Sequence, residues 1–572
     1  MKKPAFRKKS GAGAEEPFEP TEAAGAAGSA EPTGSARPSA RLPGRSAGKT
    51  TQSLLAAAVV LAAVFGIAEA RPPASPAKAD GGVAPSTAQV ERTAAVCPQP
   101  FQGLTGSTTL TAYTPPGTGS ATGGAGWLSE ESAPAVPPAA APSAPATQAP
   151  SAAPSGSGAP ATPAPDKNAA PADAKLTVTK PGTPATGPAS NGDNAPGTGA
   201  VANGALAPGF TVSQTTVVTE QRGTGLSGLT CTPENTNFWF AGASTAGDRV
   251  DYLSLVNPES SAAVVDIKLY GDKGLIDNDA ANGITVAPGS SQSVLLSTLS
   301  KGAVNDLAVN VVVRSGRIGA ALHAADGNKG ADWIPASADP APTQVMAGLP
   351  ADTSAAHLVV WAPPEDDADL KIQLSGKNGW FTPAGNESIH VKAGMVAAVD
   401  LGKVTRDEVA GLRLSPSDDK HPTRIVAGLR VDRTGGNGKS DAAWLSGSVP
   451  VGARATVADN RAGASTVFLT SSGDAATVKV TGSAGSGGGT PATKEVQIPA
   501  GGTVAIPAPE PAGLNGVFAV TVETESGGPV VAARMLSVPT KDVPMFTVQG
   551  LRDDRSTVQV PRATQDPGVV LR

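Results

Sequence analysis

A repeated arrangement of short apolar runs constrains the fold of this chain more than any other feature. A run of alternating or small residues, followed by an aromatic residue, recurs around Trp239, Trp333, Trp444 and Phe546. Successive copies lie roughly a hundred residues apart, which is the size of one small β domain. The pattern therefore predicts an array of similar domains, each closed by its own aromatic residue, and it names no reaction.

The segments between these aromatic residues favour β-strands over helices. Short runs rich in Val, Ile and Leu are separated by Pro and Gly from residue 250 onwards, and no segment beyond residue 70 shows a long helical period. Asn378 and Gly379 form a dipeptide typical of a tight hairpin. We therefore expect a mostly β protein built from tandem immunoglobulin-like antiparallel β-sandwich domains.

The amino-terminal part predicts a membrane topology. Lys and Arg are concentrated in residues 1–49, within a tract of Ala, Gly, Pro and Ser that we expect to form a disordered cytoplasmic tail. The adjoining segment, residues 50–70, is uncharged as far as Ala68 and is long enough as a helix to cross most of a hydrocarbon layer. Because positive charge precedes it, we expect a single-pass signal-anchor helix in the cell membrane, with the bulk of the chain extracytoplasmic.

A cleaved signal peptide is the alternative to this anchor. The triplet Ala68-Glu69-Ala70 satisfies the small-x-small cleavage rule, so cleavage near Ala70 would give a secreted protein. The long basic tract before the apolar stretch is unusual for a signal peptide and favours the anchor. Both interpretations place the remaining chain outside the cytoplasm.

Cys97 and Cys231 are the 2 cysteines of the chain. Thiols are not kept reduced outside the cytoplasm, so the predicted topology favours a disulfide between them. Two buried free thiols are the alternative.

Composition divides the chain into successive segments. We expect a basic tail, an anchor helix, a linker, four β domains and a flexible end, with boundaries at 1–49, 50–70, 71–93, 94–245, 246–345, 346–452, 453–552 and 553–572. Within the first domain, residues 132–200 are almost entirely Ala, Pro, Ser, Gly, Thr and Asn, which predicts a disordered insertion. Lys175–Thr179 and Thr557–Val560 nevertheless have the alternation of short strands.

Patterns that would indicate catalysis or metal binding are weak. No two of the four histidines, His323, His357, His390 and His421, have the spacing of metal ligands. The run from Ser417 to Lys420 matches S-x-x-K, but it follows a Pro in a predicted loop and lacks the partner motifs of a penicillin-binding site. We therefore expect a protein that is not an enzyme, with no catalytic residues, no cofactor and no metal.

Two acidic clusters are candidates for calcium, because oxygen-rich loops between sandwich domains can bind this ion. Asp277–Asp279 is out of register with an EF-hand loop, and Glu365–Asp369 lies where a solvated hairpin is expected. Both clusters therefore favour solvated turns over ion sites.

Charge and aromatic residues limit the classes of partner. The net charge is −5, and no basic stripe with interleaved aromatic residues follows the first fifty positions, so we expect no nucleic acid partner. Trp380 and Phe381 follow the Asn378-Gly379 turn and are candidates for an exposed pair that stacks on a sugar ring. Packing of Trp380 against Trp361 or a neighbouring domain is the alternative.

Several longer segments are similar to a known family. The segments are VCPQP at 96–100, GLTCTPENTNFWFAGAST at 228–245, LSLVNPESSAAVVDIKLYGDKG at 253–274, VAPGSSQSVLLS at 286–297, GRIGAALHAADG at 316–327 and DWIP at 332–335. In these segments the chain resembles the DUF5719 family of actinobacterial secreted or membrane-anchored proteins of unknown function, from about Val96 to its end. The resemblance implies an envelope protein, and it provides no catalytic residues to carry over.

These inferences lead to one functional prediction and one rival. We expect a non-catalytic, membrane-anchored envelope protein whose β-sandwich domains bind envelope proteins or the cell wall. The rival is a carbohydrate-binding protein that uses exposed aromatic residues such as Trp380.

Overall fold

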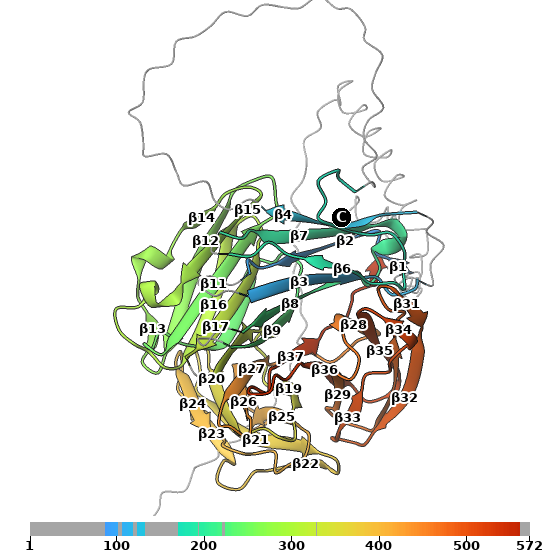
Figure 1. The fold of residues 1–572 in the computed structure, drawn as a ribbon. Helices are drawn as coiled ribbons and strands as arrows, with labels where there is room; N and C mark the ends of the chain where they lie inside the picture. Colours follow the sequence, from blue (N-terminus) through green and yellow to red (C-terminus); the bar gives the residue numbers. More distant parts are fainter. Residues whose placement is uncertain are drawn as a thin grey trace, which may run out of the picture. The chain divides into compact units, whose positions relative to one another are not determined.

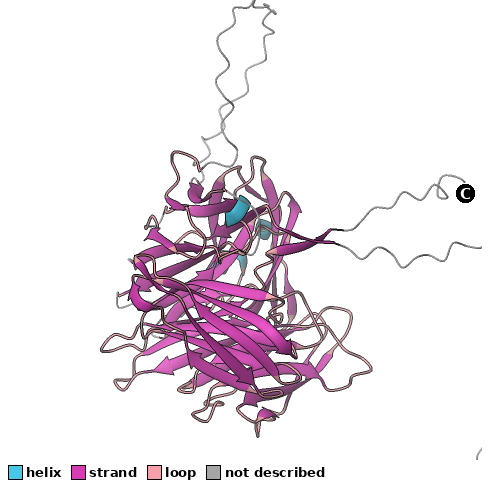
Figure 2. Cartoon of the chain, turned by 90° about the vertical axis from the view of Figure 1, so that its right-hand side faces the viewer, coloured by secondary structure: helices cyan, strands magenta, loops and turns pink. Residues whose placement is uncertain are grey.

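The computed structural model describes residues 86–100, 106–117, 123–131, 170–192, 194–219, 224–327 and 329–560. Within these ranges β-strands are the main secondary structure, as predicted, and the helical elements are short 3-10 turns at Gly204–Leu206, Asp279–Ala281 and Leu296–Leu299 (Figures 1 and 2). None of the helices in the described part is long and apolar enough to cross a membrane. The predicted tail 1–49 and anchor 50–70 lie outside the described residues.

Four antiparallel β-sandwiches follow one another along the chain, and the second shows their common plan. One of its sheets contains, in spatial order, β10 (Asn237–Ala243), β16 (Leu307–Ser315), β12 (Ala263–Gly271) and β13 (Gly274–Ile276), with β14 (Ile284–Val286) also on β12. The facing sheet contains β15 (Ser290–Leu295), β11 (Arg249–Asn257), β17 (Gly319–Asp326) and β18 (Gly330–Ile334).

The other three sandwiches repeat this plan. In the first sandwich, one sheet contains β2 (Arg92–Cys97), β7 (Gly197–Asn203), β4 (Gly126–Glu131) and β5 (Leu176–Val178). The facing sheet contains β6 (Ala185–Pro188), β3 (Gly106–Tyr113), β8 (Thr211–Val218) and β9 (Gly225–Thr230). In the third sandwich, one sheet contains β19 (Gln344–Leu349), β25 (Ala410–Pro416), β21 (Ala368–Gly376) and β22 (Gly379–Phe381), with β23 (Ser388–Val391) also on β21. The facing sheet contains β24 (Val396–Asp400), β20 (Ala355–Trp361), β26 (Val426–Thr434) and β27 (Ser440–Ser446). In the fourth sandwich, one sheet contains β28 (Arg454–Asn460), β35 (Phe518–Gly527), β30 (Ala476–Gly482) and β32 (Ala492–Ile498). The facing sheet contains β33 (Thr503–Pro507), β29 (Ser465–Ser471), β36 (Val530–Ser537) and β37 (Phe546–Leu551). A small ribbon is formed by β31 (Gly488–Thr490) and β34 (Ala512–Asn515).

The strand order is the same in all four sandwiches and differs from that of immunoglobulin domains. Counting the main strands along each sandwich, the first, fifth and third form one sheet, and the fourth, second, sixth and seventh form the other. Immunoglobulin domains instead place the first, second, fifth and fourth strands together. The predicted antiparallel β-sandwich architecture is therefore confirmed, whereas the strand connectivity is a different one.

Alternating side chains form the core of each sandwich. In β30 every second residue is buried, and Val478 and Val480 pack against the facing sheet through Val467 and Leu469. β19 is instead buried along its whole length, because its outer side packs on β29 and β36 of the fourth sandwich. Strands with one solvated face therefore alternate between buried and more exposed residues, whereas strands between two sandwiches are buried at every position.

The predicted disordered insertion at 132–200 is partly wrong. Residues 132–169 lie outside the described residues, but β5 and β6 lie within the predicted range and β7 begins in it. The strand predicted at Lys175–Thr179 is confirmed by β5. The strand β7 (GTGAVAN) is an inner strand between β2 and β4. Its backbone groups can form sheet hydrogen bonds regardless of side-chain type, and its small side chains allow another backbone to approach closely.

The two ends of the described chain pair with each other. β1 (Ser86–Gln89) runs antiparallel to β38 (Thr557–Val560), and this ribbon projects from the sandwiches in Figure 2. The short strand predicted near the carboxyl terminus is therefore confirmed. The linker predicted at 71–93 and the flexible tail predicted at 553–572 are both ordered where they approach this ribbon, because each strand supplies the other's hydrogen-bond partners.

The four sandwiches contact one another in a closed cycle. The last strands β9, β18, β27 and β37 pack against each other at its centre, and further contacts join β2 to β17, β10 to β26, β19 to β36 and β28 to β8. A ring cluster of Trp239, Tyr270 and Trp361 fills the junction of the second and third sandwiches, with centroids of the two Trp rings 4.2 Å apart. Residues 84–572 accordingly form one compact unit.

We predicted that Trp239 closes the first sandwich, and this prediction is wrong. It lies on β10, the opening strand of the second sandwich, where it pairs with Asn310 of β16. Trp333 and Trp444 do lie on equivalent last strands, β18 and β27. The last strand of the first sandwich, β9, carries only Gly, Leu, Ser and Thr and no aromatic residue.

Candidate functional site

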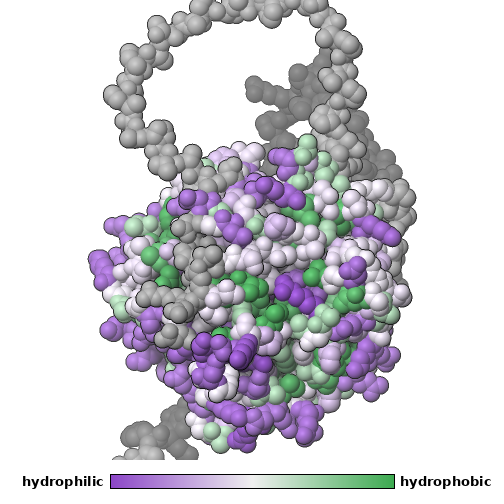
Figure 3. All heavy atoms as spheres, in the orientation of Figure 1, coloured by the Kyte–Doolittle hydropathy of each residue, from purple (hydrophilic) through white to green (hydrophobic). Residues whose placement is uncertain are grey.

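A cleft of about 1110 Å³ lies where the first, second and fourth sandwiches meet. It exceeds the usual size of a small-molecule pocket, about 300–1,000 Å³. We call it the junction cleft. Its lining includes Arg92, Ala94, Trp127, Glu131, Thr230, Trp333, Gln549 and Arg552. Figure 3 shows apolar side chains interspersed with polar ones over the visible face of the molecule.

One wall of the junction cleft is the outer face of the sheet containing β2, β7 and β4. Ala95, Ala200 and Leu128 of these strands point into the core of the first sandwich. Alternation therefore directs Ala94, Val201 and Trp127 to the other face, where all three line the cleft. The wall thus carries Ala94, Val201 and the half-buried indole of Trp127.

Glu131 ends this wall and depends on a neighbouring glycine. A Cβ atom on Gly199 would lie 2.3 Å from Oε1 of Glu131, so only glycine allows the carboxylate to lie across β7. Burial, together with the charge of Glu234, raises the pKa of Glu131 to about 7. The cleft therefore contains an acidic pair of which one member is easily protonated.

Arginine side chains occupy other parts of the lining. Arg317 is paired with Glu259 at 2.9 Å, and Asp554 of the lining is paired with Arg454, which lies outside it. Arg552, just after β37, donates to the carbonyl oxygen of Ala336 and has no carboxylate partner among the described residues. Arg552 is an exposed residue, so the cleft presents a guanidinium that a ligand can reach.

Gln549 of β37 lies at the floor of the cleft and is 4% exposed. Its Oε1 accepts a hydrogen bond of 2.6 Å from Nη2 of Arg534. Its Nε2 lies against Gly228, where a Cβ would be 2.4 Å away, and has no hydrogen-bond acceptor within the described part of the chain. An amide donor is thus buried at the floor without its own acceptor.

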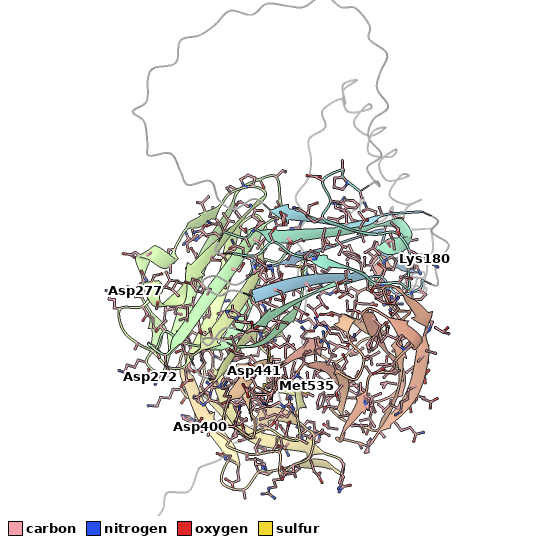
Figure 4. The ribbon with its side chains drawn as sticks, viewed as in Figure 1. Lys180, Asp272, Asp277, Asp400, Asp441 and Met535 are labelled. Carbon is pink, nitrogen blue, oxygen red and sulfur yellow. A yellow bond between two sulfur atoms is a disulfide. The ribbon has the colours of Figure 1, made fainter. Side chains whose placement is uncertain are left out.

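Behind this floor, buried carboxylates join the four sandwiches. Asp441 of β27 accepts backbone N–H bonds from Leu226 of β9 at 3.2 Å, from Phe546 of β37 at 2.8 Å and from Ala442 at 3.0 Å. Asp332 of β18 accepts from the N–H of Gly228 at 2.9 Å. Figure 4 places Asp441 between the sandwiches. We call Asp332, Asp441, Arg534 and Gln549 the central cluster.

Burial dominates the protonation of this cluster. It raises the pKa of Asp441 to about 8, against the opposing effect of the N–H donors, and raises the pKa of Asp332 well above its usual value. Burial also lowers the pKa of Arg534 to about 10. We did not predict this cluster from sequence. A signal was present, because Asp332 begins DWIP and Asp441 begins DAAW, and an Asp is unusual in an apolar strand.

The disulfide between Cys97 and Cys231 is formed, as predicted. It joins the end of β2 to the residue after β9, and so connects the two sheets of the first sandwich beside the junction cleft. Next to it, Val96 and Thr232 exchange two backbone hydrogen bonds, of 2.7 and 3.2 Å.

The predicted ligand residues Trp380 and Phe381 lie away from the junction cleft, on β22. Trp380 stacks on the guanidinium of Arg413, with 4.3 Å from Cζ to the ring centroid, and it lies against Gly501 of the fourth sandwich. Phe381 is 39% exposed. Trp380 therefore packs against a neighbouring sandwich, the alternative that we considered for it.

The four histidines and the acidic loops are separated in space. His323 is buried beside Trp333, and burial lowers its pKa well below the usual range. His357, His390 and His421 each contact nearby Asp carboxylates. In the described ranges no three His, Cys, Asp or Glu residues, including those of Asp277–Asp279 and Glu365–Asp369, are grouped to hold a metal ion. Asp418, within the S-x-x-K match, instead accepts a bond from its own Lys420 N–H.

Comparison with known proteins gives one assignment. No curated protein and no solved structure matches the chain. A model of a family of unknown function, DUF5719, matches residues 186–509, a narrower range than the one from Val96 to the end that we expected. These residues extend from β6 of the first sandwich to just beyond β33 of the fourth and make up more than half of the sequence, so the chain belongs to the DUF5719 family.

Proposed function

We propose that this is a non-catalytic binding protein of the cell envelope, held in the membrane by residues 50–70, which presents its sandwiches outside the cytoplasm. The observation that carries the proposal is the junction cleft, because ligand sites are concave and occur preferentially between domains. The Cys97–Cys231 disulfide supports the compartment, since such bonds persist where thiols are oxidised.

Two variants of this function differ in anchoring and in ligand. Cleavage near Ala70 would release the same cleft in a secreted protein. Carbohydrate binding by Trp380 and Phe381 is disfavoured by the packing of Trp380 on Arg413, and the half-buried aromatic residue that lines a space large enough for a ligand is Trp127.

Thiol labelling tests the topology, because both native cysteines are bonded. Ser260 is exposed in the cleft lining, and Ser10 lies in the predicted cytoplasmic tail. We expect a membrane-impermeant maleimide to label Ser260→Cys in intact cells and to label Ser10→Cys only after lysis. The reverse pattern would place the sandwiches inside the cell. An amino-terminal sequence that begins at Arg71 would replace the anchor by secretion.

The same Ser260→Cys protein tests the cleft as a binding site. Purified peptidoglycan fragments, cell-wall polysaccharide and a mixture of short random peptides are added before the maleimide. At least one should slow the labelling of Ser260→Cys. If all three leave the rate unchanged, the junction cleft is not a ligand site for these envelope components and the proposed function fails.

A further inference from the structure

β2 has a free edge that faces the junction cleft. It pairs with β7 on one side only, and it lies at the border of its sheet. Val96 exchanges its backbone hydrogen bonds with Thr232 on the side away from β7. Since backbone groups of an antiparallel strand alternate between its two sides, Ala94 and Arg92 present their N–H and C=O groups to the same free side.

A second strand ends beside this free edge. β9 pairs with β8 only, and its Leu226 and Gly228 direct their N–H groups away from β8, to Asp441 and Asp332. By the same alternation Thr230 directs its backbone groups away from β8, and it lines the cleft. Neither Ala94 nor Thr230 has another hydrogen-bond partner on this side among the described residues. Unpaired edge groups of this kind are a template for an added strand.

The charge of the cleft specifies one end of such a strand. Arg552 is an exposed guanidinium without a carboxylate salt-bridge partner in the described chain, and guanidinium groups pair with carboxylates in a bidentate geometry. The amide donor of Gln549 lies at the floor of the same cleft without an acceptor there. A ligand carboxylate would pair with Arg552, whereas the Nε2 atom of Gln549 is too deeply buried for a ligand to reach.

We propose that the junction cleft binds an extended peptide, which adds to β2 as a new edge strand and pairs its carboxylate with Arg552. The inference rests on the proposed function, since it names the ligand class of the same cleft. The small side chain of Ala94 leaves room for the peptide's side chains beside Trp127. The carboxylate belongs to an acidic side chain or to the peptide's own carboxyl terminus.

The test selects short random peptides displayed with a free carboxyl terminus against the intact chain. An enriched peptide is then synthesised with a free terminus, with an amidated terminus, and with its acidic residues changed to amides. Loss of the responsible carboxylate should weaken binding by roughly tenfold or more, as expected for a charge-assisted hydrogen bond. The form that loses affinity identifies which source supplies the carboxylate. Equal affinity of all forms would overturn the role of Arg552.

Backbone methylation tests the strand pairing without altering the protein. Peptides methylated at the nitrogens of alternate residues should fall into two sets. The set whose N–H groups face β2 should lose binding, and the other set should retain it. If methylation in either register has the same effect, the peptide is not added to β2.

Protein variants give an independent readout. Arg552→Gln should weaken the free-carboxylate peptide roughly tenfold or more, and Ala94→Pro, which removes an edge N–H that β7 does not use, should weaken every form. Lys494→Gln, an exposed change on β32, is the control and should bind normally. Full affinity of a folded Ala94→Pro protein would contradict the inference.

The outcomes separate this inference from the proposed function. If no peptide is enriched but polysaccharide or peptidoglycan fragments slow the labelling of Ser260→Cys, the peptide inference is wrong and the cleft remains a binding site. If no peptide is enriched and no envelope component protects Ser260→Cys, both fail.

Discussion

At the scale of single residues, Asp441 makes the contacts on which the assembly of the sandwiches most depends. Its carboxylate reaches strands of the first and fourth sandwiches from the third. Space around it is limited, because a Cβ on Gly225 or Gly330 would lie 2.5 or 2.3 Å from its Oδ1. Glycine at these two positions is therefore a packing requirement of the carboxylate.

Replacement of Asp441 by Ala should strongly destabilise the fold. The change leaves the N–H groups of Leu226, Ala442 and Phe546 buried without acceptors, and each such group costs about 1–3 kcal/mol. We expect the free energy of unfolding in urea to fall by about 3 kcal/mol or more. Asp272→Ala, at an exposed position of the second sandwich, should change it by less than about 0.5 kcal/mol. Equal effects of the two substitutions would contradict the role of Asp441.

His357 should make the junction of the second and third sandwiches sensitive to pH. Its Nε2 lies 2.7 Å from Asp306 of the second sandwich, and its Nδ1 lies 2.6 Å from Asp400 of the third. The bond to Asp306 raises the pKa of His357 above 6.5. Its stabilising effect is therefore complete at acidic pH, below the unfolded pKa, and is lost as the pH rises through the raised folded value.

Urea unfolding of the wild type and of His357→Gln should show this dependence. We expect the wild type to be more stable than the variant at pH 6 and the difference to shrink by pH 8. Other groups with altered pKa values contribute equally to both proteins and cancel in the difference. A difference that stays constant over this range, or grows with pH, would mean that His357 is not charged in the folded protein.

At the scale of elements, the disulfide links the two sheets of the first sandwich, and the ribbon of β1 and β38 joins the two ends of the described chain. Cys97 and Cys231 are separated by 134 positions, so the bond constrains a loop that includes most of the first sandwich. β1 and β38 join residues near both ends by main-chain pairing alone, since all four residues of β38 are exposed. The disulfide should therefore contribute far more to stability than the ribbon.

Removal of the disulfide by Cys97→Ser with Cys231→Ser should lower the free energy of unfolding by up to about 5 kcal/mol, mainly by relaxing the unfolded chain. Calorimetry or urea unfolding of the double variant against the wild type measures this. The wild type in reductant should resemble the double variant. No change in either case would mean that β3, β7 and β8 hold the first sandwich without the bond.

At the scale of the whole molecule, the sandwiches are expected to unfold together. Each shares its last strand with the central packing of β9, β18, β27 and β37, and the cores of neighbouring sandwiches are continuous at Trp444 and Phe546. Tandem domains joined by loops alone would instead unfold independently.

Urea unfolding followed by Trp fluorescence and by circular dichroism should therefore give coincident single transitions. Asp441→Ala should separate them, because it removes the bonds between sandwiches and leaves each inner core intact. Two or more transitions in the wild type would show that the cycle of contacts adds little energy.

The sandwich architecture could be predicted from the sequence because strand and turn positions depend on residue type and on the order of neighbouring residues. Residues such as Val478 and Val480 alternate with polar ones, and Asn378-Gly379 requires a hairpin whatever surrounds it. The sequence also indicated the disulfide, since Cys97 and Cys231 are the two cysteines of the chain and could pair with no other cysteine in it. The candidate site was not accessible in the same way, because Arg92, Glu131, Trp333 and Arg552 come from three sandwiches and have no common spacing.

What the sequence determined by itself was the strand content, the repeating unit and the pairing of its two cysteines, because each of these depends on residue type and on short-range order. Tertiary structure alone decided that β7 is an inner strand despite its Gly and Ala, that Trp239 opens the second sandwich, and that Asp332 and Asp441 are buried between strands. These features depend on contacts across a hundred residues or more. Their energies come from the neighbours that the closed cycle brings together, which no local pattern contains.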